Sequence, residues 1–227
     1  MPSRIEFVEV GPRDGLQNES THISTAQKIE LITRAYAAGV RRIETTSFVH
    51  PQRVPQMADA EAVMAGLPAL PGLITIGLAL NKHGALRALE TSVQELGTAC
   101  MATDSFGLRN QGQTADESLR VASEIVKLAK AEGRRAQITI SVAFGCPFEG
   151  RVDPQRVIDM AKAAAQAEPL EISLADTIGA GAPGPVGDLV SRVREVIHPL
   201  PLRVHFHNTR NTGLANVWAA LQAGASI

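Results

Sequence analysis

Residues 8–19 read VEVGPRDGLQNE, and this stretch decides between two folds that share the same alternation of strands and helices. The run Ile5–Val10 predicts a first β-strand that leads directly into a loop. That loop lacks the G-x-G-x-x-G spacing of a dinucleotide-binding turn and contains a proline. An open, doubly wound sheet is therefore disfavoured, and a closed (β/α)₈ barrel is favoured.

The rest of the chain repeats a unit of one strand followed by one helical stretch, which predicts a parallel sheet covered by helices. The predicted strands are Ile5–Val10, Arg42–Thr46, Ile74–Leu80, Glu95–Ala102, Gln137–Ala143, Glu171–Ala175 and Leu202–His207. An eighth strand would begin near residues 225–227, where the sequence ends. We therefore expect one α/β domain over residues 1–227, a TIM (β/α)₈ barrel that lacks its last strand and helix.

Capping residues mark the predicted helix boundaries. Ser24 with Gln27 and Thr114 with Glu117 have the spacing of a capping box, and Asp153 precedes a proline at a first helical position. Three predicted helices end at glycines, which are Gly39, Gly133 and Gly224.

Composition limits the classes of function. The 227 residues are 44% hydrophobic and carry 22 Lys and Arg against 23 Asp and Glu. The chain can bury a sizeable core, but it has no large field for nucleic acid or an anionic membrane, so we expect a small-molecule substrate. No apolar run reaches the roughly 20 residues of a membrane span, and we expect a cytoplasmic protein. Two cysteines, Cys100 and Cys146, are too few for a disulfide framework.

Polar residues gather at the predicted strand ends, where a barrel carries its active site. They are Arg13, Asp14, Glu44, Asp176, His205 and His207. His205 and His207 are two residues apart on a strand, so both imidazoles point to one face and can reach one ion. With a carboxylate from the first strand they would leave coordination positions open, as a catalytic metal requires. We expect Mg²⁺ or Mn²⁺, with Zn²⁺ and Co²⁺ also compatible; two polar rim residues without an ion remain the alternative.

The other candidates suit enolate chemistry. Arg13 cannot act as a base, but its guanidinium can hold an enolate or carboxylate oxygen. Glu44 would orient it, although an ordinary buried ion pair explains Glu44 equally well. Asp176 could orient a base or a substrate hydroxyl, or it could hold a turn. Nothing near Cys146 in the sequence lowers its pKa, so we expect a packing residue.

These motifs together resemble the 3-hydroxy-3-methylglutaryl-CoA lyase family. The resemblance rests on residues 11–19, Glu44 with residues 47–49, and residues 54–57, 145–150, 173–179 and 205–207. It implies a homodimer that cleaves 3-hydroxy-3-methylglutaryl-CoA, or a closely related hydroxyacyl-CoA, to acetyl-CoA and acetoacetate.

The resemblance also implies roles for individual residues. Asp14, His205 and His207 would hold a divalent cation. Arg13 would stabilise the enolate with support from Glu44, and Asp176 would belong to the polar network around the reacting hydroxyl. We accordingly expect Arg13, Glu44, Asp176 and His205 to be catalytic, and Arg13 and Gln17 to contact substrate.

The chain departs from the family pattern near the substrate. Asn208 stands where the family usually has aspartate, and residues 209–212 replace a Thr-Tyr-Gly-Gln sequence. The acyl group is therefore left open. The family's catalytic cysteine and an asparagine metal ligand would lie beyond residue 227. Two alternatives remain, an aldolase or Claisen-type condensing synthase acting on 2-oxo acids and a non-catalytic protein that binds a metal or a CoA ester.

Overall fold

The computed structural model describes residues 4–227, which fall into two compact units. The N-terminal unit comprises Phe7–Gly97 and Leu128–Ala136. The C-terminal unit comprises Thr98–Lys127 and Gln137–Ile227, together with the described residues up to Glu6. The single-domain organisation expected from the sequence stays a prediction.

Six strands of the described chain are hydrogen-bonded in chain order, which are β1 (Arg42–Ser47), β2 (Ile74–Leu78), β3 (Glu95–Met101), β4 (Arg135–Ser141), β5 (Ile172–Asp176) and β6 (Leu202–Phe206). The pairs β1–β2, β2–β3, β4–β5 and β5–β6 are parallel. The predicted α/β class with a parallel sheet is confirmed, and these six predicted strands end within one or two residues of their predicted limits. Because these pairs are parallel, the carboxyl ends of paired strands lie on one edge of the sheet within each unit.

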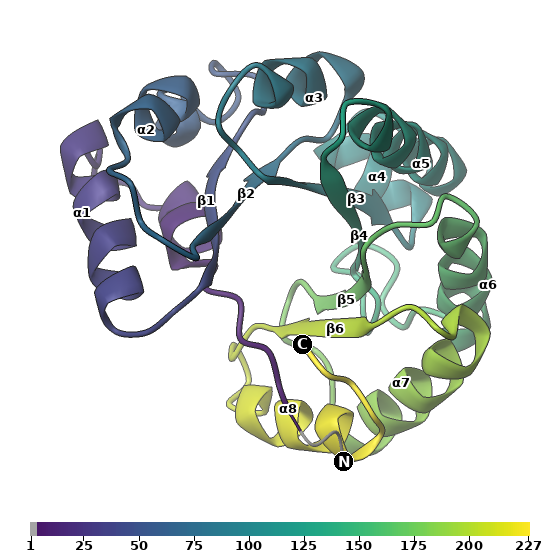
Figure 1. Ribbon diagram of the computed structural model, residues 1–227. Helices are drawn as coiled ribbons and strands as arrows, with labels where there is room; N and C mark the ends of the chain where they lie inside the picture. Colours follow the sequence, from purple (N-terminus) through teal and green to yellow (C-terminus); the bar gives the residue numbers. More distant parts are fainter. Residues whose placement is uncertain (1–3) are drawn as a thin grey trace. The chain divides into compact units, whose positions relative to one another are not determined.

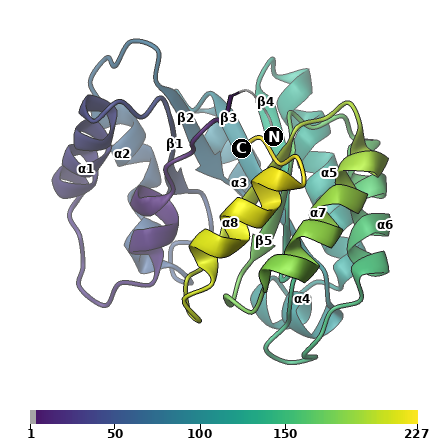
Figure 2. The same ribbon diagram turned by 90° about the horizontal axis from the view of Figure 1, so that it is seen from below.

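Helices alternate with the strands, as the sequence predicts. They are α1 (Thr25–Ala37), α2 (Ala60–Gly66), α3 (Lys82–Leu89), α4 (Asp104–Asn110), α5 (Ala115–Ala131), α6 (Pro154–Ala165), α7 (Pro183–Ile197) and α8 (Gly213–Gln222), with a short π-helical turn η1 (Gly11–Gly15) and a 3₁₀ turn η2 (Pro55–Met57). In the N-terminal unit α1 and α2 lie beside β1, and in the C-terminal unit α6, α7 and α8 follow one another along β5 and β6 (Figure 1). Figure 2 shows α7 and α8 side by side. No helix among residues 4–227 is both long and apolar enough to cross a membrane.

The predicted helix caps are confirmed. The Ser24 hydroxyl accepts from the Gln27 amide while the Gln27 side chain accepts from the Ser24 amide, and Thr114 and Glu117 bond in the same reciprocal way. Asp153 accepts from the amide two residues later, with proline at the first helical position. All three predicted C-terminal glycines, Gly39, Gly133 and Gly224, have positive φ.

The structure corrects the strand predicted over Ile5–Val10. Only Glu9 forms a β-bridge, with Ile43. The Glu6 amide donates to the Ser226 carbonyl of the C-terminal unit, whereas the Glu9 amide donates to the Arg42 carbonyl of the N-terminal unit. Composition predicted a strand here, but successive residues do not pair with one partner strand, so no regular ladder forms.

Each unit has its own apolar core. In the N-terminal unit Ile32 of α1, Ile43 of β1 and Val63 of α2 are fully buried together. In the C-terminal unit Leu174 of β5 and Val190 of α7 are fully buried. Burial of one such side chain contributes roughly 1.5–3 kcal/mol, so these contacts hold the strand ends in place.

Candidate active site

The turn η1 carries the first two candidate residues, Arg13 and Asp14. Three of its amides donate to the Val10 carbonyl oxygen, at 3.1, 2.7 and 3.4 Å. The Glu9 carboxylate accepts from the Gly11 amide at 2.6 Å and anchors the start of the turn. Single π-helical turns are rare and are frequent at functional sites. Here the turn presents a cation and an anion from adjacent positions.

Arg13 is held between two carboxylates. Its Nε donates to Glu44 on β1, and its Nη1 donates to Asp14 Oδ1 at 2.9 Å. Burial lowers the pKa of Arg13, but the Glu44 and Asp14 carboxylates outweigh that effect and raise this pKa above its ordinary value. The guanidinium is therefore a permanent charge in a fixed orientation. We call Arg13, Asp14 and Glu44 the arginine half-site.

Gln17 follows the same turn and lines a cavity of about 350 Å³. This cavity is formed by residues 17–20, His22 and residues 53–56, all in the N-terminal unit. Gln17 Oε1 is buried and accepts no hydrogen bond from any residue within 4–227. A buried acceptor without a donor is unfavourable by about 1–3 kcal/mol, so the geometry suits a ligand that donates to it.

His205 and His207 lie at the end of β6 and just beyond it, in the C-terminal unit. Their Nε2 atoms are 3.1 Å apart, and their rings meet edge to face with an interplanar angle of 72°. Two nitrogens bound to one ion at about 2.1 Å, at a right angle, would be roughly 3.0 Å apart. The pair therefore fits adjacent positions around one divalent cation. We call His205, His207 and Asp176 the histidine half-site.

Asp176 ends β5 and is completely buried. Its two carboxylate oxygens accept from the amides of Ala180 at 2.8 Å and Gly181 at 2.9 Å. The Asp176 carbonyl also accepts from the Gly179 amide at 3.1 Å. This geometry supports the turn-holding interpretation, in which Asp176 fixes the loop that follows its strand.

Two residues near this half-site have roles that sequence patterns did not reveal. Asn208 Oδ1 accepts from the Gly213 amide at 2.9 Å and so fixes the start of α8; asparagine supplies the same acceptor atom as aspartate. Thr177 Oγ1 accepts at 2.8 Å from the amide of Val142, whose φ is +52°. A β-branched residue rarely adopts this conformation. Thr177 lies within residues 173–179, one of the segments that carry the family resemblance, and nothing else in its local sequence marks this role.

Both cysteines are buried, and the part of the chain that the structure describes places neither in a disulfide. Cys146 Sγ accepts from the Thr103 hydroxyl at 3.2 Å and from the Phe148 amide at 3.4 Å. These contacts support the interpretation of Cys146 as a packing residue. Burial raises the pKa of the Cys100 thiol to about 12.

Alternating strands and helices with polar residues after the strand ends define an α/β enzyme of the barrel class. The chain belongs to the HMGL-like family, whose family model matches residues 4–227. This is a metal-dependent enzyme family, and the expected family resemblance, fold class and lyase class are confirmed.

Relatives of established name agree over the whole chain. The mitochondrial hydroxymethylglutaryl-CoA lyase of Bos taurus is 40% identical over 226 residues, covering 100% of this chain and 70% of the relative. A 3-hydroxy-3-isohexenylglutaryl-CoA/hydroxymethylglutaryl-CoA lyase of Pseudomonas aeruginosa is 39% identical, with 100% and 76% covered. The chain thus spans about 70–76% of the length of these relatives.

Solved structures agree as well. The crystal structure of hydroxymethylglutaryl-CoA lyase from Pseudomonas aeruginosa superposes with a TM-score of 0.94 at 39% identity, covering 100% of this chain and 75% of that one. An HMG-CoA lyase from Acinetobacter baumannii, solved in complex with coenzyme A and 3-methylmalate, gives 0.93 at 38% identity, with 98% and 73% covered. The carboxyl transferase domain of Rhizobium etli pyruvate carboxylase, at 17% identity and a TM-score of 0.74, shares the fold.

Proposed function

We propose that this protein is a metal-dependent lyase that cleaves 3-hydroxy-3-methylglutaryl-CoA, or a closely related hydroxyacyl-CoA, to acetyl-CoA and acetoacetate. The single observation that carries the chemistry is Arg13, a largely buried cation in the turn η1 that Glu44 fixes in place. Relatives named as this lyase support the substrate. The acetyl-CoA half of the reaction passes through an enolate, and a fixed cation is the group that stabilises one.

We further propose that Asp14, His205 and His207 hold one divalent cation. Two imidazoles and a carboxylate are suitable donors for Mn²⁺, Zn²⁺ or Co²⁺, and the carboxylate together with oxygen atoms of the substrate favours Mg²⁺ or Mn²⁺. A bound cation supplies Lewis-acid polarisation of the substrate hydroxyl and carboxylate. His205 would count as catalytic through the cation that it helps to hold.

The chain's own residues would then manage the charge that develops during cleavage. The hydroxyl loses its proton and its oxygen forms the new carbonyl of acetoacetate, while the electron pair of the breaking carbon–carbon bond moves into the thioester as an enolate. A proton then returns to the enolate carbon and gives acetyl-CoA, so that no net proton is gained or lost. Arg13 donates hydrogen bonds to the resulting enolate oxygen, and Glu44 keeps the guanidinium in place so that no reorganisation is needed at that moment. Asp176 would act as a positioning residue through the loop that follows β5.

The acyl group is the open part of this proposal. The Pseudomonas aeruginosa relative is named for both isohexenylglutaryl and methylglutaryl substrates. This chain has Asn208 and its own sequence over residues 209–212 close to the histidine half-site. We therefore propose a branched 3-hydroxyglutaryl-CoA as the substrate class, with the length of the branch to be measured.

The test uses the purified full-length protein with Mg²⁺ or Mn²⁺ and a panel of hydroxyacyl-CoA thioesters. Acetyl-CoA and the oxo-acid product are followed by mass spectrometry. We expect cleavage that EDTA abolishes and that Mg²⁺ or Mn²⁺ restores, and an unchanged rate for R120Q, which alters an exposed cation on α5. Cleavage of 2-oxo-acid aldols instead would favour the aldolase alternative, and metal binding without any cleavage would favour the non-catalytic one.

A further inference from the structure

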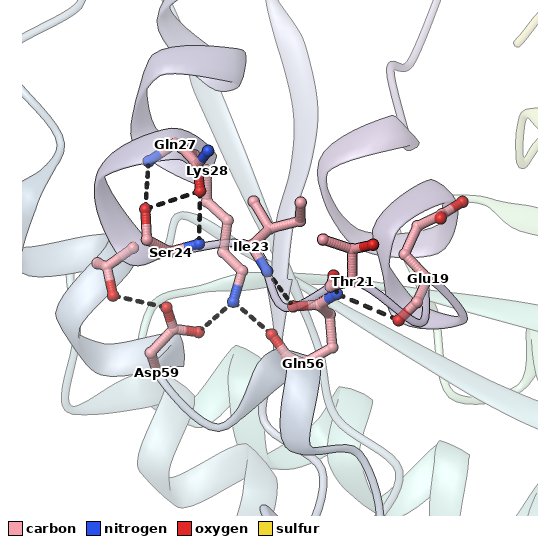
Figure 3. A network of polar contacts seen from close by, with 9 residues as sticks. Glu19, Thr21, Ile23, Ser24, Gln27, Lys28, Gln56 and Asp59 are labelled. Carbon is pink, nitrogen blue, oxygen red and sulfur yellow. Dashed lines mark hydrogen bonds and ion pairs between the residues drawn. The ribbon is translucent and has the colours of Figure 1, made fainter.

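One buried side chain holds the segment that connects η1 to α1, residues 18–24. Gln56 lies in η2, is 6% exposed, and contacts three backbone groups of this segment (Figure 3). Its Oε1 accepts from the Ile23 amide at 3.0 Å, and its Nε2 donates to the carbonyls of Thr21 at 2.9 Å and Glu19 at 3.4 Å. One side-chain amide thus supplies hydrogen-bond partners for three backbone groups of a segment that forms no regular hydrogen-bond ladder of its own.

Lys28 fixes the backbone of Gln56 through a hydrogen bond to its carbonyl. Lys28 is almost completely buried, and its Nζ donates to the Gln56 carbonyl and to Asp59 Oδ1, the latter at 2.6 Å (Figure 3). Asp59 Oδ2 in turn accepts from the Thr25 hydroxyl at 2.7 Å. A buried ammonium is tolerated only when it is paired and hydrogen-bonded, as it is here. The backbone of Gln56 is therefore fixed independently of its side-chain bonds.

The clamped segment forms one wall of the 350 Å³ cavity, and residues 53–56 form the other. Gln17, the residue just before the segment, lines the cavity and keeps a buried Oε1 without a hydrogen-bond donor in the described chain. The cavity and the unsatisfied oxygen are separate observations, and both indicate a place for a ligand group. Gln56 lines the cavity itself, and through its bonds to the backbone of the neighbouring segment it also fixes the position of Gln17.

We propose that Gln56, supported by Lys28, is a positioning residue for substrate: it holds residues 17–23 as the wall of a subsite in which Gln17 accepts an N–H or O–H of the acyl-CoA. This inference rests on the proposed function for its substrate class. Gln56 itself does not touch the reacting atoms, so its loss should weaken binding more than chemistry.

The experiment compares Q56M with Q94M in the full-length protein. Gln94 provides a matched control, because it also bonds to a backbone amide of the N-terminal unit, that of Thr75, but away from the cavity. We expect Q56M to raise KM about tenfold with kcat within threefold, and Q94M to change neither. Hydrogen exchange of the peptide over residues 17–23 should accelerate in Q56M alone.

A double-mutant cycle separates positioning from a general loss of structure. Q17L should raise KM by a similar factor, and Q17L/Q56M should be no worse than either single variant, because both act on one contact. Additive effects would overturn the inference, as would a Q56M protein that loses kcat and thermal stability without a change in KM. If Q56M does not fold, Q17L and Q56E carry the test, since glutamate keeps the acceptor for Ile23.

Failure of the proposed function is distinguishable from failure of this inference. A wild-type protein that cleaves no hydroxyacyl-CoA would refute the lyase proposal but would leave the positioning role of Gln56 open to the binding test that follows. The affinity for coenzyme A, measured by calorimetry, needs no turnover. We expect Q56M to weaken it at least fivefold, and an unchanged affinity with faster exchange of residues 17–23 would show that the clamp serves structure only.

Discussion

Arg42 and Glu44 lie two residues apart on β1, so their side chains leave the same face of the strand, yet their surroundings differ. Arg42, at the start of the strand, donates a hydrogen bond from Nε to Glu95 at 2.9 Å and forms an ion pair with it through Nη2 at 2.8 Å, and Glu95 also pairs with Arg135 at 2.6 Å. Glu44, nearer the end, pairs with Arg13 of the turn η1. At the start of β1, Arg42 thus belongs to an ion cluster with residues of other strands. At its end, Glu44 pairs with a residue of the turn η1.

The same contrast recurs on β6 in the C-terminal unit. Arg203 bonds to Gln137 of β4 at 2.8 Å and lies 3.6 Å from Glu171, beside the start of β5. His205, two residues further on, faces His207 instead. Strand starts are thus fixed by partners on neighbouring strands, and strand ends by loops whose residues can change without disturbing the sheet. Charged residues at the strand starts therefore stabilise the fold, whereas charged residues at the strand ends are available for chemistry.

The largest expected effect follows from breaking the arginine half-site. R13Q should lower kcat by about 10²–10³, because one fixed hydrogen-bond donor to a developing oxyanion is lost. The urea midpoint should fall as well, because R13Q removes the arginine partner of Glu44, which is only 5% exposed, so kcat is compared for the folded fraction. Steady-state kinetics with hydroxymethylglutaryl-CoA measure the first quantity and circular dichroism the second. An R13Q enzyme with more than a tenth of wild-type kcat would contradict the assignment.

The converse substitution tests the ion cluster of Arg42, Glu95 and Arg135 at the strand starts. R42M removes one of the two arginines that pair with Glu95, which is 0% exposed, and leaves the half-exposed Arg135; it should cost about 3–5 kcal/mol of unfolding free energy. The kcat of the folded fraction should stay within twofold. R135M is the matched control: its side chain is 52% exposed, so its loss should cost about 0–1 kcal/mol. Equal urea midpoints for R42M and wild type would refute the contrast.

Local patterns revealed much of this architecture. Residue periodicity located six strands because alternation is a property of each segment alone, and the two-residue spacing of His205 and His207 directly predicts that their side chains share a face. Adjacent Arg13 and Asp14 stood out because such a pair has no packing purpose. Each of these signals is contained within a few residues.

The rest depends on contacts between distant segments. Gln56 lies over thirty residues from the amide that it accepts from, and nothing in its local pattern marks a side chain that bonds to backbone. Arg42 and Glu95 are likewise joined by register between strands rather than by spacing. The failed strand over Ile5–Val10 has the same cause, because pairing with a neighbour, and not composition, makes a strand.

A metal ion should stabilise the wild-type protein through the histidine half-site. At a concentration near 100 times its dissociation constant, Mn²⁺ should add about 2.7 kcal/mol, which raises the melting temperature by roughly 5–10 °C. H205N and H207N should lose most of this gain, and H83Q, which changes an exposed histidine on α3, should keep it. Scanning fluorimetry with and without EDTA measures the shift. Equal stabilisation of H205N would place the ion elsewhere.

The effect that is smallest at neutral pH concerns Cys100, which lies on β3 on the opposite face from Glu95 and belongs to neither charged end of the strands. Burial raises its pKa from an ordinary 9.0 to about 12, so the folded protein keeps the thiol protonated where the unfolded chain ionises it. Its contribution to stability is therefore complete below pH 9 and declines as the pH rises toward 12, with a slope approaching about 1.4 kcal/mol per pH unit. C100A should show a shallower loss of stability over this range by urea titration, with unchanged kcat at neutral pH. Iodoacetamide should label Cys100 at pH 8 only after unfolding, as mass spectrometry can determine, and rapid labelling of the folded protein would show that β3 opens between its charged start and the active-site end.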